Sequence, residues 1–223
     1  MKRYILFILL ISLFSGVYAQ NQFGLLPQIN TNFKVNDSWK MNTKLEGRQL
    51  FLQNPFPDGK PEVEFERLDL ELVATKRMGP MLSLGGGYLL RRESGEFIHR
   101  FIQQLSITQK LSTSRIAHRI RTDQTLEKEE AVQLRLRYRL SWEKALNGLE
   151  IDPEEFYLKI NNEYLGILQQ GEGNLEVRGL AAIGYVISDK NQIETGVDYR
   201  LEDLVGPIPV HKLFITIGYY HSF

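Results

Sequence analysis

The chain contains no cysteine among its 223 residues. Disulfide bonds, cysteine-based catalysis and a lipid anchor attached through cysteine are therefore excluded. An excess of charge of one sign is also lacking, because 27 basic side chains stand against 27 acidic ones. Nucleic-acid binding needs a concentrated basic surface, so we expect no nucleic-acid partner.

Long apolar runs are lacking except at the start of the chain, so no later segment reaches the roughly 20 apolar residues of a membrane helix. The single run, residues 4–14, follows two basic residues and precedes Ala19. This order is typical of a secretory signal peptide. We therefore expect residues 1–19 to be cleaved on export and residues 20–223 to form one domain.

Alternation of polar and apolar residues dominates the remaining chain, and it is the pattern of a β-strand with two different faces. It is clearest at residues 132–143, where Leu136 and Tyr138 alternate with Arg135 and Arg137. Similar segments lie near residues 23–35, 39–48, 62–76, 81–91, 97–109, 115–125, 156–164, 175–187, 192–201 and 211–223. Many exceed the 5–6 residues usual in soluble strands and suit tilted membrane strands of about 9–11 residues.

These segments predict an all-β fold, an antiparallel up-and-down transmembrane β-barrel. We count about eleven segments, but bacterial single-chain barrels have even strand numbers. We therefore expect 10–12 strands and favour 12. The mean hydropathy of −0.26 is compatible with a membrane barrel, because only alternate residues of each strand face lipid. The alternative is a soluble periplasmic barrel with Leu134 and Leu136 turned inward around a small apolar ligand.

The final segment ends on an aromatic residue at the C-terminus. Ile217, Tyr219 and Phe223 share one face of this segment. Such an ending resembles the signal that the barrel-assembly machinery reads in bacterial outer-membrane proteins. We expect an outer-membrane location, contact with outer-membrane lipids, and engagement of that machinery during biogenesis.

The connections are expected to be short on the periplasmic side, where the C-terminus would lie, and longer outside. The expected periplasmic turns are 36–38, 77–80, 111–114 and 188–191, and the expected outer loops are 54–61, 92–96, 127–130, 169–174 and 202–209. The long connection 145–155 breaks this pattern, because it falls on the periplasmic side.

The polar faces carry the strongest candidate site, a lumen charge cluster. Its arginines are Arg115, Arg119, Arg121, Arg135, Arg137 and Arg139. A hairpin turn near Lys128 places Arg121 opposite Arg135 and Arg119 opposite Arg137. Like charges opposite each other repel, so they need compensation. The candidate partners on the inward face are Glu64, Glu66, Asp69, Glu71 and Glu163, with Glu46, Asp123, Glu176 and Glu194 in addition.

Two interpretations of this cluster stay open. In the first, ion pairs fill the interior and close it, as in other small barrels. In the second, an arginine ladder attracts anionic solutes or lipid head groups. An open water-filled channel is not expected, because wide channels belong to barrels of about 16–18 strands.

A lipid-modifying enzyme is a further alternative. It would need a serine nucleophile beside a histidine. The four histidines are His99, His118, His211 and His221. A turn near residues 111–114 places His118 opposite Ile107, and no serine lies convincingly beside His99 or His118. We expect no enzyme, no metal site and no cofactor.

Several motifs resemble a known family. They are Leu134–Leu140, Phe156–Leu158, Asn162–Glu163, Trp39, Arg48 and the ending Gly218–Phe223. Through them the mature chain is similar to domain-of-unknown-function family 2490, a group of predicted outer-membrane proteins typical of Bacteroidota. The resemblance implies a barrel in the outer membrane and brings no activity. We expect a structural, interaction or minor transport role in the Gram-negative envelope, with the solute or protein partner unknown.

Overall fold

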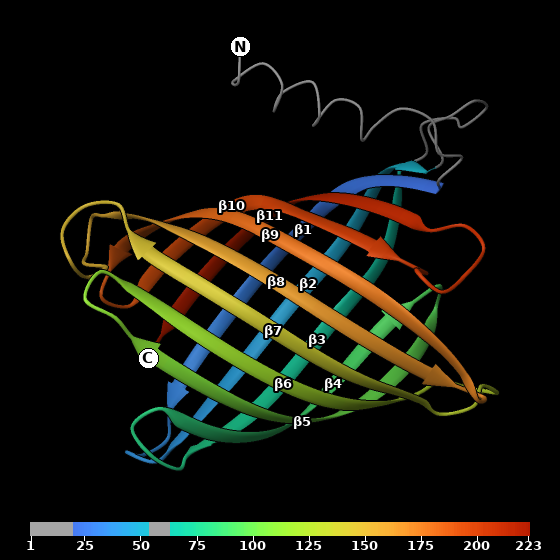
Figure 1. Ribbon diagram of the computed structural model, residues 1–223, viewed down its shortest axis with the longest axis horizontal. Helices are drawn as coiled ribbons and strands as arrows, with labels where there is room; N and C mark the ends of the chain where they lie inside the picture. Colours follow the sequence, from blue (N-terminus) through green and yellow to red (C-terminus); the bar gives the residue numbers. More distant parts are fainter. Residues whose placement is uncertain (1–19, 54–62) are drawn as a thin grey trace.

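Eleven β-strands make up the described part of the chain, residues 20–53 and 63–223 of a computed structural model (Figure 1). The strands are β1 (Gln20–Lys34), β2 (Trp39–Gln53), β3 (Glu64–Arg77), β4 (Leu82–Glu93), β5 (Glu96–Lys110), β6 (Ser114–Leu126), β7 (Gln133–Ala145), β8 (Phe156–Gln169), β9 (Glu172–Ser188), β10 (Asn191–Glu202) and β11 (Val210–Ser222). The expected signal peptide, 1–19, and the expected loop 54–61 lie outside the described residues. Within the described ranges, no helix is long and apolar enough to span a membrane.

The strands close into one barrel, in which each strand pairs with its neighbours in sequence and β1 pairs with β11. Every pair is antiparallel except β1–β11, which is parallel. The β-barrel is thereby confirmed, whereas the preference for 12 strands and the expectation of antiparallel pairing throughout are wrong. The reason is geometric. With an odd number of alternating strands the first and last run in the same direction, so the barrel closes only through a parallel pair.

The parallel seam has a full ladder and side-chain contacts along its length. Leu25 is the register partner of Ile215, and thirteen residues of each strand are aligned in this way. Gln28 donates to the hydroxyl of Tyr220 at 2.8 Å. At the end of the seam the rings of Phe33 and Phe223 stack with centroids 4.4 Å apart. The C-terminal residue is therefore held against the first strand.

The connections differ in part from expectation. Two of the loops expected to be long, 92–96 and 169–174, are two-residue turns, Ser94–Gly95 and Gln170–Gly171. All four turn residues have positive φ, the combination that a tight type I′ hairpin requires. The strands extend further into these turns than the apolar periodicity indicated. The long connection at the other end lies where it was expected, between β7 and β8.

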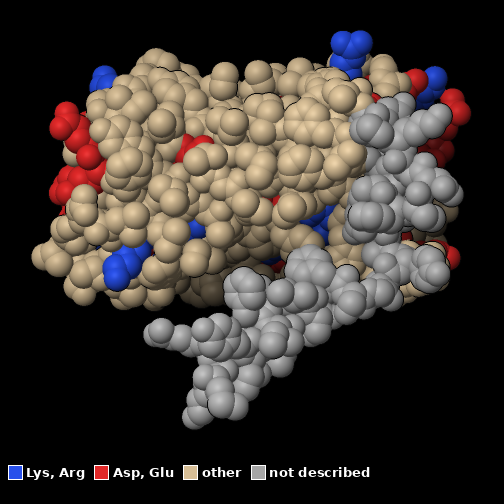
Figure 2. All heavy atoms as spheres, turned by 90° about the horizontal axis from the view of Figure 1, so that it is seen from above, with Lys and Arg blue, Asp and Glu red and all other residues tan. Residues whose placement is uncertain are grey.

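The two faces of the barrel have opposite chemistry. Outward-facing Leu134 and Leu136 are 46% and 58% exposed, whereas inward-facing Arg135 and Arg137 are 9% and 8% exposed. Figure 2 shows charged side chains gathered mainly at the two ends of the visible face, with a broad zone nearly free of them between. A soluble barrel around an apolar ligand requires the reverse arrangement, so that alternative is wrong in its placement of these residues.

Cysteine crosslinking tests the parallel seam, since the chain has no other cysteine to interfere. The pair Leu25→Cys with Ile215→Cys should form a disulfide, because register partners on adjacent strands lie about 5 Å apart, within the range that a disulfide spans. The product is detected by its change in gel mobility on reduction. Leu25→Cys with Tyr219→Cys, displaced by about 13 Å along the strand, is the control and should not crosslink. Equal crosslinking of the two pairs would contradict this closure.

Candidate functional site

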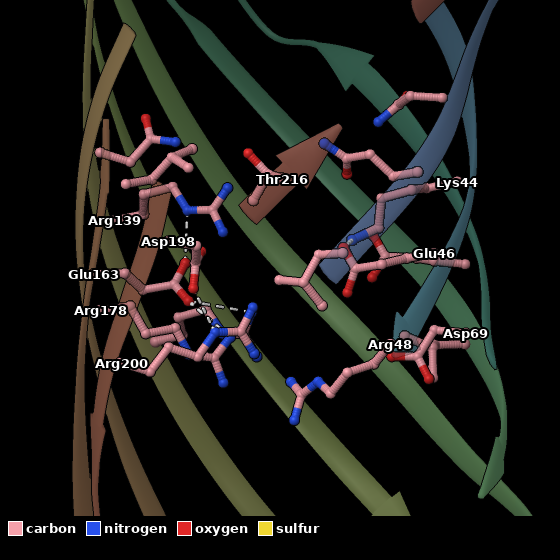
Figure 3. Close-up of a pocket in the computed structure, with 18 of the residues that line it drawn as sticks. Lys44, Glu46, Arg48, Asp69, Arg139, Glu163, Arg178, Asp198, Arg200 and Thr216 are labelled. Carbon is pink, nitrogen blue, oxygen red and sulfur yellow. Dashed lines mark hydrogen bonds and ion pairs between the residues drawn. The ribbon is translucent and has the colours of Figure 1, made fainter. Parts of the chain in front are cut away.

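The lumen holds a cavity of about 430 Å³ whose lining is mostly charged. Fourteen of the lining side chains are basic and ten are acidic, and these charged residues come from every strand except β1. Figure 3 shows two of its walls, one with Arg139, Glu163 and Arg178 and the other with Glu46 and Arg48. Strand alternation explains this concentration, because every second residue points inward.

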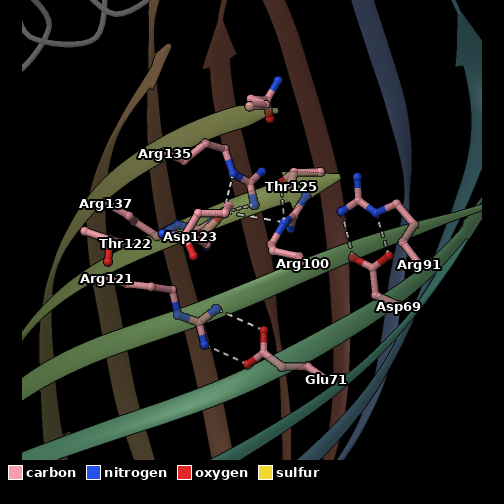
Figure 4. Close-up of polar contacts among 12 residues, drawn as sticks. Asp69, Glu71, Arg91, Arg100, Arg121, Thr122, Asp123, Thr125, Arg135 and Arg137 are labelled. Carbon is pink, nitrogen blue, oxygen red and sulfur yellow. Dashed lines mark hydrogen bonds and ion pairs between the residues drawn. The ribbon is translucent and has the colours of Figure 1, made fainter. Parts of the chain in front are cut away.

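Some ion pairs cross the lumen instead of joining neighbouring strands. Arg121 on β6 binds both carboxylate oxygens of Glu71 on β3, at 2.9 and 2.8 Å (Figure 4). Lys159 on β8 donates to Glu194 on β10 at 2.9 Å, and the Tyr157 hydroxyl donates to the same carboxylate at 2.7 Å. These bridges occupy the interior and connect opposite or next-nearest walls.

A second cavity, of about 440 Å³, lies toward the end of the barrel that carries the C-terminus. Arg119, Arg121, Glu71, Lys159 and Glu194 line both cavities. The two cross-lumen bridges therefore lie where the cavities meet. They leave a cavity of several hundred Å³ on each side.

Asp123 on β6 is fully buried and is shared by several arginines (Figure 4). Arg135 on β7 forms an ion pair and a hydrogen bond with one of its oxygens. Arg100 on β5 lies 3.4 Å from the same oxygen, and Arg137 lies 3.9 Å from the other. The single negative charge of Asp123 is thus shared among three positively charged guanidinium groups.

Glu163 on β8 is shared in the same manner. Its nearest partner is Arg139, with Nε at 2.6 Å. Arg137 and Arg178 lie 3.4 and 3.5 Å from its other oxygen, and Arg119 lies 3.8 Å away. The side chain of Glu163 is only 2% exposed, so this compensation takes place out of bulk water.

The expected arginine register needs a correction. Arg119 lies opposite Arg139 and Arg121 lies opposite Arg137, whereas Asp123 lies opposite Arg135. The pairing is displaced by two residues from the prediction, because the loop between β6 and β7 spans residues 127–132 and is not centred on Lys128. Two pairs of arginines therefore face each other across the ladder, as predicted, but each arginine of β6 has a different partner on β7.

The predicted partners are mostly brought together, although not always with the predicted arginines. Asp69 holds Arg91 through two hydrogen bonds of 2.8 Å, and Glu66 accepts from Arg48 at 3.2 Å. Glu64 is exposed at the first position of β3. Glu46 pairs with Lys44 and Glu176 pairs with Arg178, each on its own strand, whereas Glu194 on β10 pairs with Lys159 on β8, beyond the intervening β9. Arg115 pairs with Glu143, which the sequence analysis did not select.

Six inward arginines were missed by the sequence analysis. They are Arg48, Arg67, Arg91, Arg100, Arg178 and Arg200. Most of them follow the polar side of their strand, so the same alternation contained the signal, whereas Arg100 lies between the buried Ile98 and Ile102 and had no such signal. Arg48 and Arg200 place their guanidinium carbons 4.9 and 5.1 Å from the ring centroid of Phe214, a fully buried aromatic residue in the lumen. Phe214 also packs with Leu26 and Leu50, so the two cation–π contacts join the charged lining to a small apolar cluster.

The histidines lie apart from the lumen, on the outward face. Residue His118 is the register partner of Ile107, as predicted, and it hydrogen-bonds to the Tyr138 hydroxyl at 2.9 Å. His99 hydrogen-bonds in the same way to a tyrosine on the neighbouring strand, and His211 does so at 2.5 Å. His221 hydrogen-bonds to an asparagine at 2.7 Å. In the described ranges no three His, Cys, Asp or Glu side chains are grouped to hold a metal ion.

The C-terminal residues selected from sequence all face outward. Ile217, Tyr219 and Phe223 are exposed, on the side of β11 opposite to Phe214. Their side chains are therefore accessible at the surface of the barrel wall.

Substitution of the Arg121–Glu71 bridge tests whether the lumen is held by cross-lumen ion pairs. Arg121→Met should lower the free energy of unfolding by about 3–5 kcal/mol, because it leaves a buried carboxylate unpaired. Adding Glu71→Leu should restore much of this loss, since no unpaired charge then remains. Denaturant titration of the purified protein measures both values.

The Arg115–Glu143 pair, whose arginine is 50% exposed, provides the matched control. Arg115→Met should cost less than about 1 kcal/mol, because water screens this pair. An equal loss for Arg115→Met and Arg121→Met would contradict the role assigned to the cross-lumen bridge.

Comparison with known proteins gives one family match. A search of curated proteins found no match, and a search of solved structures also found none. The model of the family described as "Protein of unknown function (DUF2490)" matches residues 23–207, which cover ten of the eleven strands in whole or in large part. The chain belongs to this family of proteins of unknown function, DUF2490.

Proposed function

We propose that the protein is an integral outer-membrane β-barrel with a structural, interaction or minor transport role in the Gram-negative envelope. The observation that carries this proposal is the distribution of side chains, apolar outside and charged inside. A protein surrounded by water keeps its exposed apolar surface small and rarely buries charged side chains. A barrel surrounded by lipid needs an apolar outer surface, and its charged side chains then lie in the interior.

Every strand of the barrel contributes exposed apolar side chains to the outward surface. Phe101 on β5, Leu136 on β7 and Ile217 on β11 are each at least 50% exposed. Leaving such an area in water costs roughly 25 cal/mol per Å², whereas lipid chains remove this cost. Each of the eleven described strands is also paired on both sides in the closed ladder, as the hydrocarbon region of a membrane demands.

Tyrosine and histidine pairs fit the polar boundaries of a membrane. Tyr199 and His211 lie near one end of the barrel, and His118 lies near the other. Hydrogen bonds to tyrosine satisfy the imidazole rings where water is scarce, and the aromatic bodies remain in contact with lipid. These pairs support interfacial roles for the histidines and give no support to a catalytic one.

The orientation follows from the C-terminal strand. With the aromatic ending at the periplasmic side, the two-residue turns of β4–β5 and β8–β9 point outward. Because β1 is parallel to β11, the first described strand then begins at the outer side. The exposed Ile217, Tyr219 and Phe223 are available to the barrel-assembly machinery in this orientation.

The lumen favours a closed or narrowly selective barrel over a general porin. Buried bridges separate two cavities of about 430 and 440 Å³. Because these bridges lie where the two cavities meet, a transport role is limited to small solutes that compete for the same charges.

Cell fractionation combined with a heat-modifiability gel tests the proposal. The protein should appear in the outer-membrane fraction and should migrate faster before boiling than after it, because membrane barrels keep their closed ladder in detergent. Recovery in the soluble periplasm without a mobility shift would contradict the membrane role, whatever the fold.

A further inference from the structure

The charges that line the 430 Å³ cavity are not evenly compensated. Nine of the fourteen basic side chains can each be assigned a carboxylate of their own among the lining residues. The remaining five are Arg100, Arg119, Arg135, Arg137 and Arg139, called here the arginine cluster. They occupy one continuous stretch of wall on β5, β6 and β7.

Among the described residues, two carboxylates remain for the arginine cluster. These are Asp123 and Glu163, and Glu163 is also approached by Arg178. Five guanidinium charges against two carboxylates leave an excess of three positive charges on this wall. An arginine does not lose its proton in proteins, so the excess cannot be removed by deprotonation.

Unused hydrogen-bond donors lie in the same cluster. The Nε atoms of Arg119 and Arg137 are buried and have no acceptor. The side chain of Arg137 is only 9% exposed, so its donor is cut off from bulk water. A buried donor without an acceptor costs about 1–3 kcal/mol, more when it is charged. Both the charge and the donors of this wall therefore fit an additional anionic acceptor.

The cavity gives such an acceptor space next to the arginines. Arg119 and Arg139 are 25% and 32% exposed to it, more than the other members of the cluster. Arg119 also lines the second cavity, so it is reached from both sides of the bridges. Figure 3 shows Arg139 beside Glu163 on the cavity wall.

We propose that the arginine cluster binds a small phosphate-class oxyanion, with Arg119, Arg137 and Arg139 as its direct ligands. A tetrahedral dianion offers several acceptor oxygens to guanidinium forks, which bind phosphate bidentately. Its charge removes most of the excess of three. The proposal depends on the inward orientation of the arginines and does not depend on the cellular location of the protein.

Isothermal titration calorimetry of the purified protein with inorganic phosphate, at ionic strength held constant with sodium chloride, tests the proposal. Saturable binding is expected for the unmodified protein. Arg119→Gln should weaken the phosphate affinity by about tenfold or more, the value of one charged hydrogen-bonding partner. Lys212→Gln is the matched control, because Lys212 lines the same cavity but has Glu202 as its partner at 2.9 Å. It should leave the affinity within about twofold, since Lys212 lies on β11, which does not neighbour β5, β6 or β7, and solvent ions screen its charge.

Thermal unfolding gives a second readout that separates binding from misfolding. In the absence of phosphate, Arg119→Gln should unfold at the same temperature as the unmodified protein or a higher one, because it removes a repelling charge. Phosphate should raise the unfolding temperature of the unmodified protein and have much less effect on Arg119→Gln. Glu163→Gln should unfold earlier than the unmodified protein and should be stabilised more by phosphate.

The source of the phosphate group is decided by a parallel titration with phosphatidic acid in mixed micelles. A response to free phosphate assigns a soluble anion, and a response to phosphatidic acid alone assigns a lipid head group. No saturable binding of either, or equal losses of affinity in Arg119→Gln and Lys212→Gln, would overturn the proposal.

Discussion

Compensation of buried charge is the constraint on which the rest of this structure depends. The inward faces of β2 to β11 bring basic side chains and carboxylates into a space too small to hydrate them all. Each charge therefore needs a partner of opposite sign, and the partners lie on the same strand, the next strand or across the lumen. The bridge from Arg121 to Glu71 belongs to the last class and joins strands that are not neighbours. Such a bridge forms only when the barrel is closed, so closure of the barrel and pairing of the buried charges depend on each other.

The outer face is the complement of this arrangement. Because successive residues of a strand point to opposite sides, packing the charges inward turns the apolar residues outward. The ladder closes completely, and the parallel β1–β11 pair is what permits this with eleven strands. Stacking of Phe33 on Phe223 secures the end of that seam. The proposed membrane location and the charged lumen are therefore two consequences of one alternating pattern.

Much of this could be predicted from sequence, and the limits have physical causes. Alternation located all eleven strands and the side on which Arg137 and Leu136 lie. The short turn after β5 was strongly signalled, so the pairing of His118 with Ile107 was correct.

The loop after β6 has no comparable turn signal, and there the arginine register was displaced by two residues. The strand number was misjudged because a rule about even counts was preferred to the count itself. The Glu71–Arg121 contact could not be predicted, since its residues are fifty apart and meet only through the curvature of the closed sheet.

Fluorescence quenching in lipid vesicles tests most directly whether the apolar face meets lipid. The chain has two tryptophans, Trp39 and Trp142, and both lie on the outward face near the same end of the barrel. Lipids brominated near the head group should quench the fluorescence of both tryptophans. The variants Trp39→Phe and Trp142→Phe each leave a single tryptophan, so the quenching of each can be measured separately. A water-soluble quencher should have little effect. Strong quenching from water with none from brominated lipid would contradict the account.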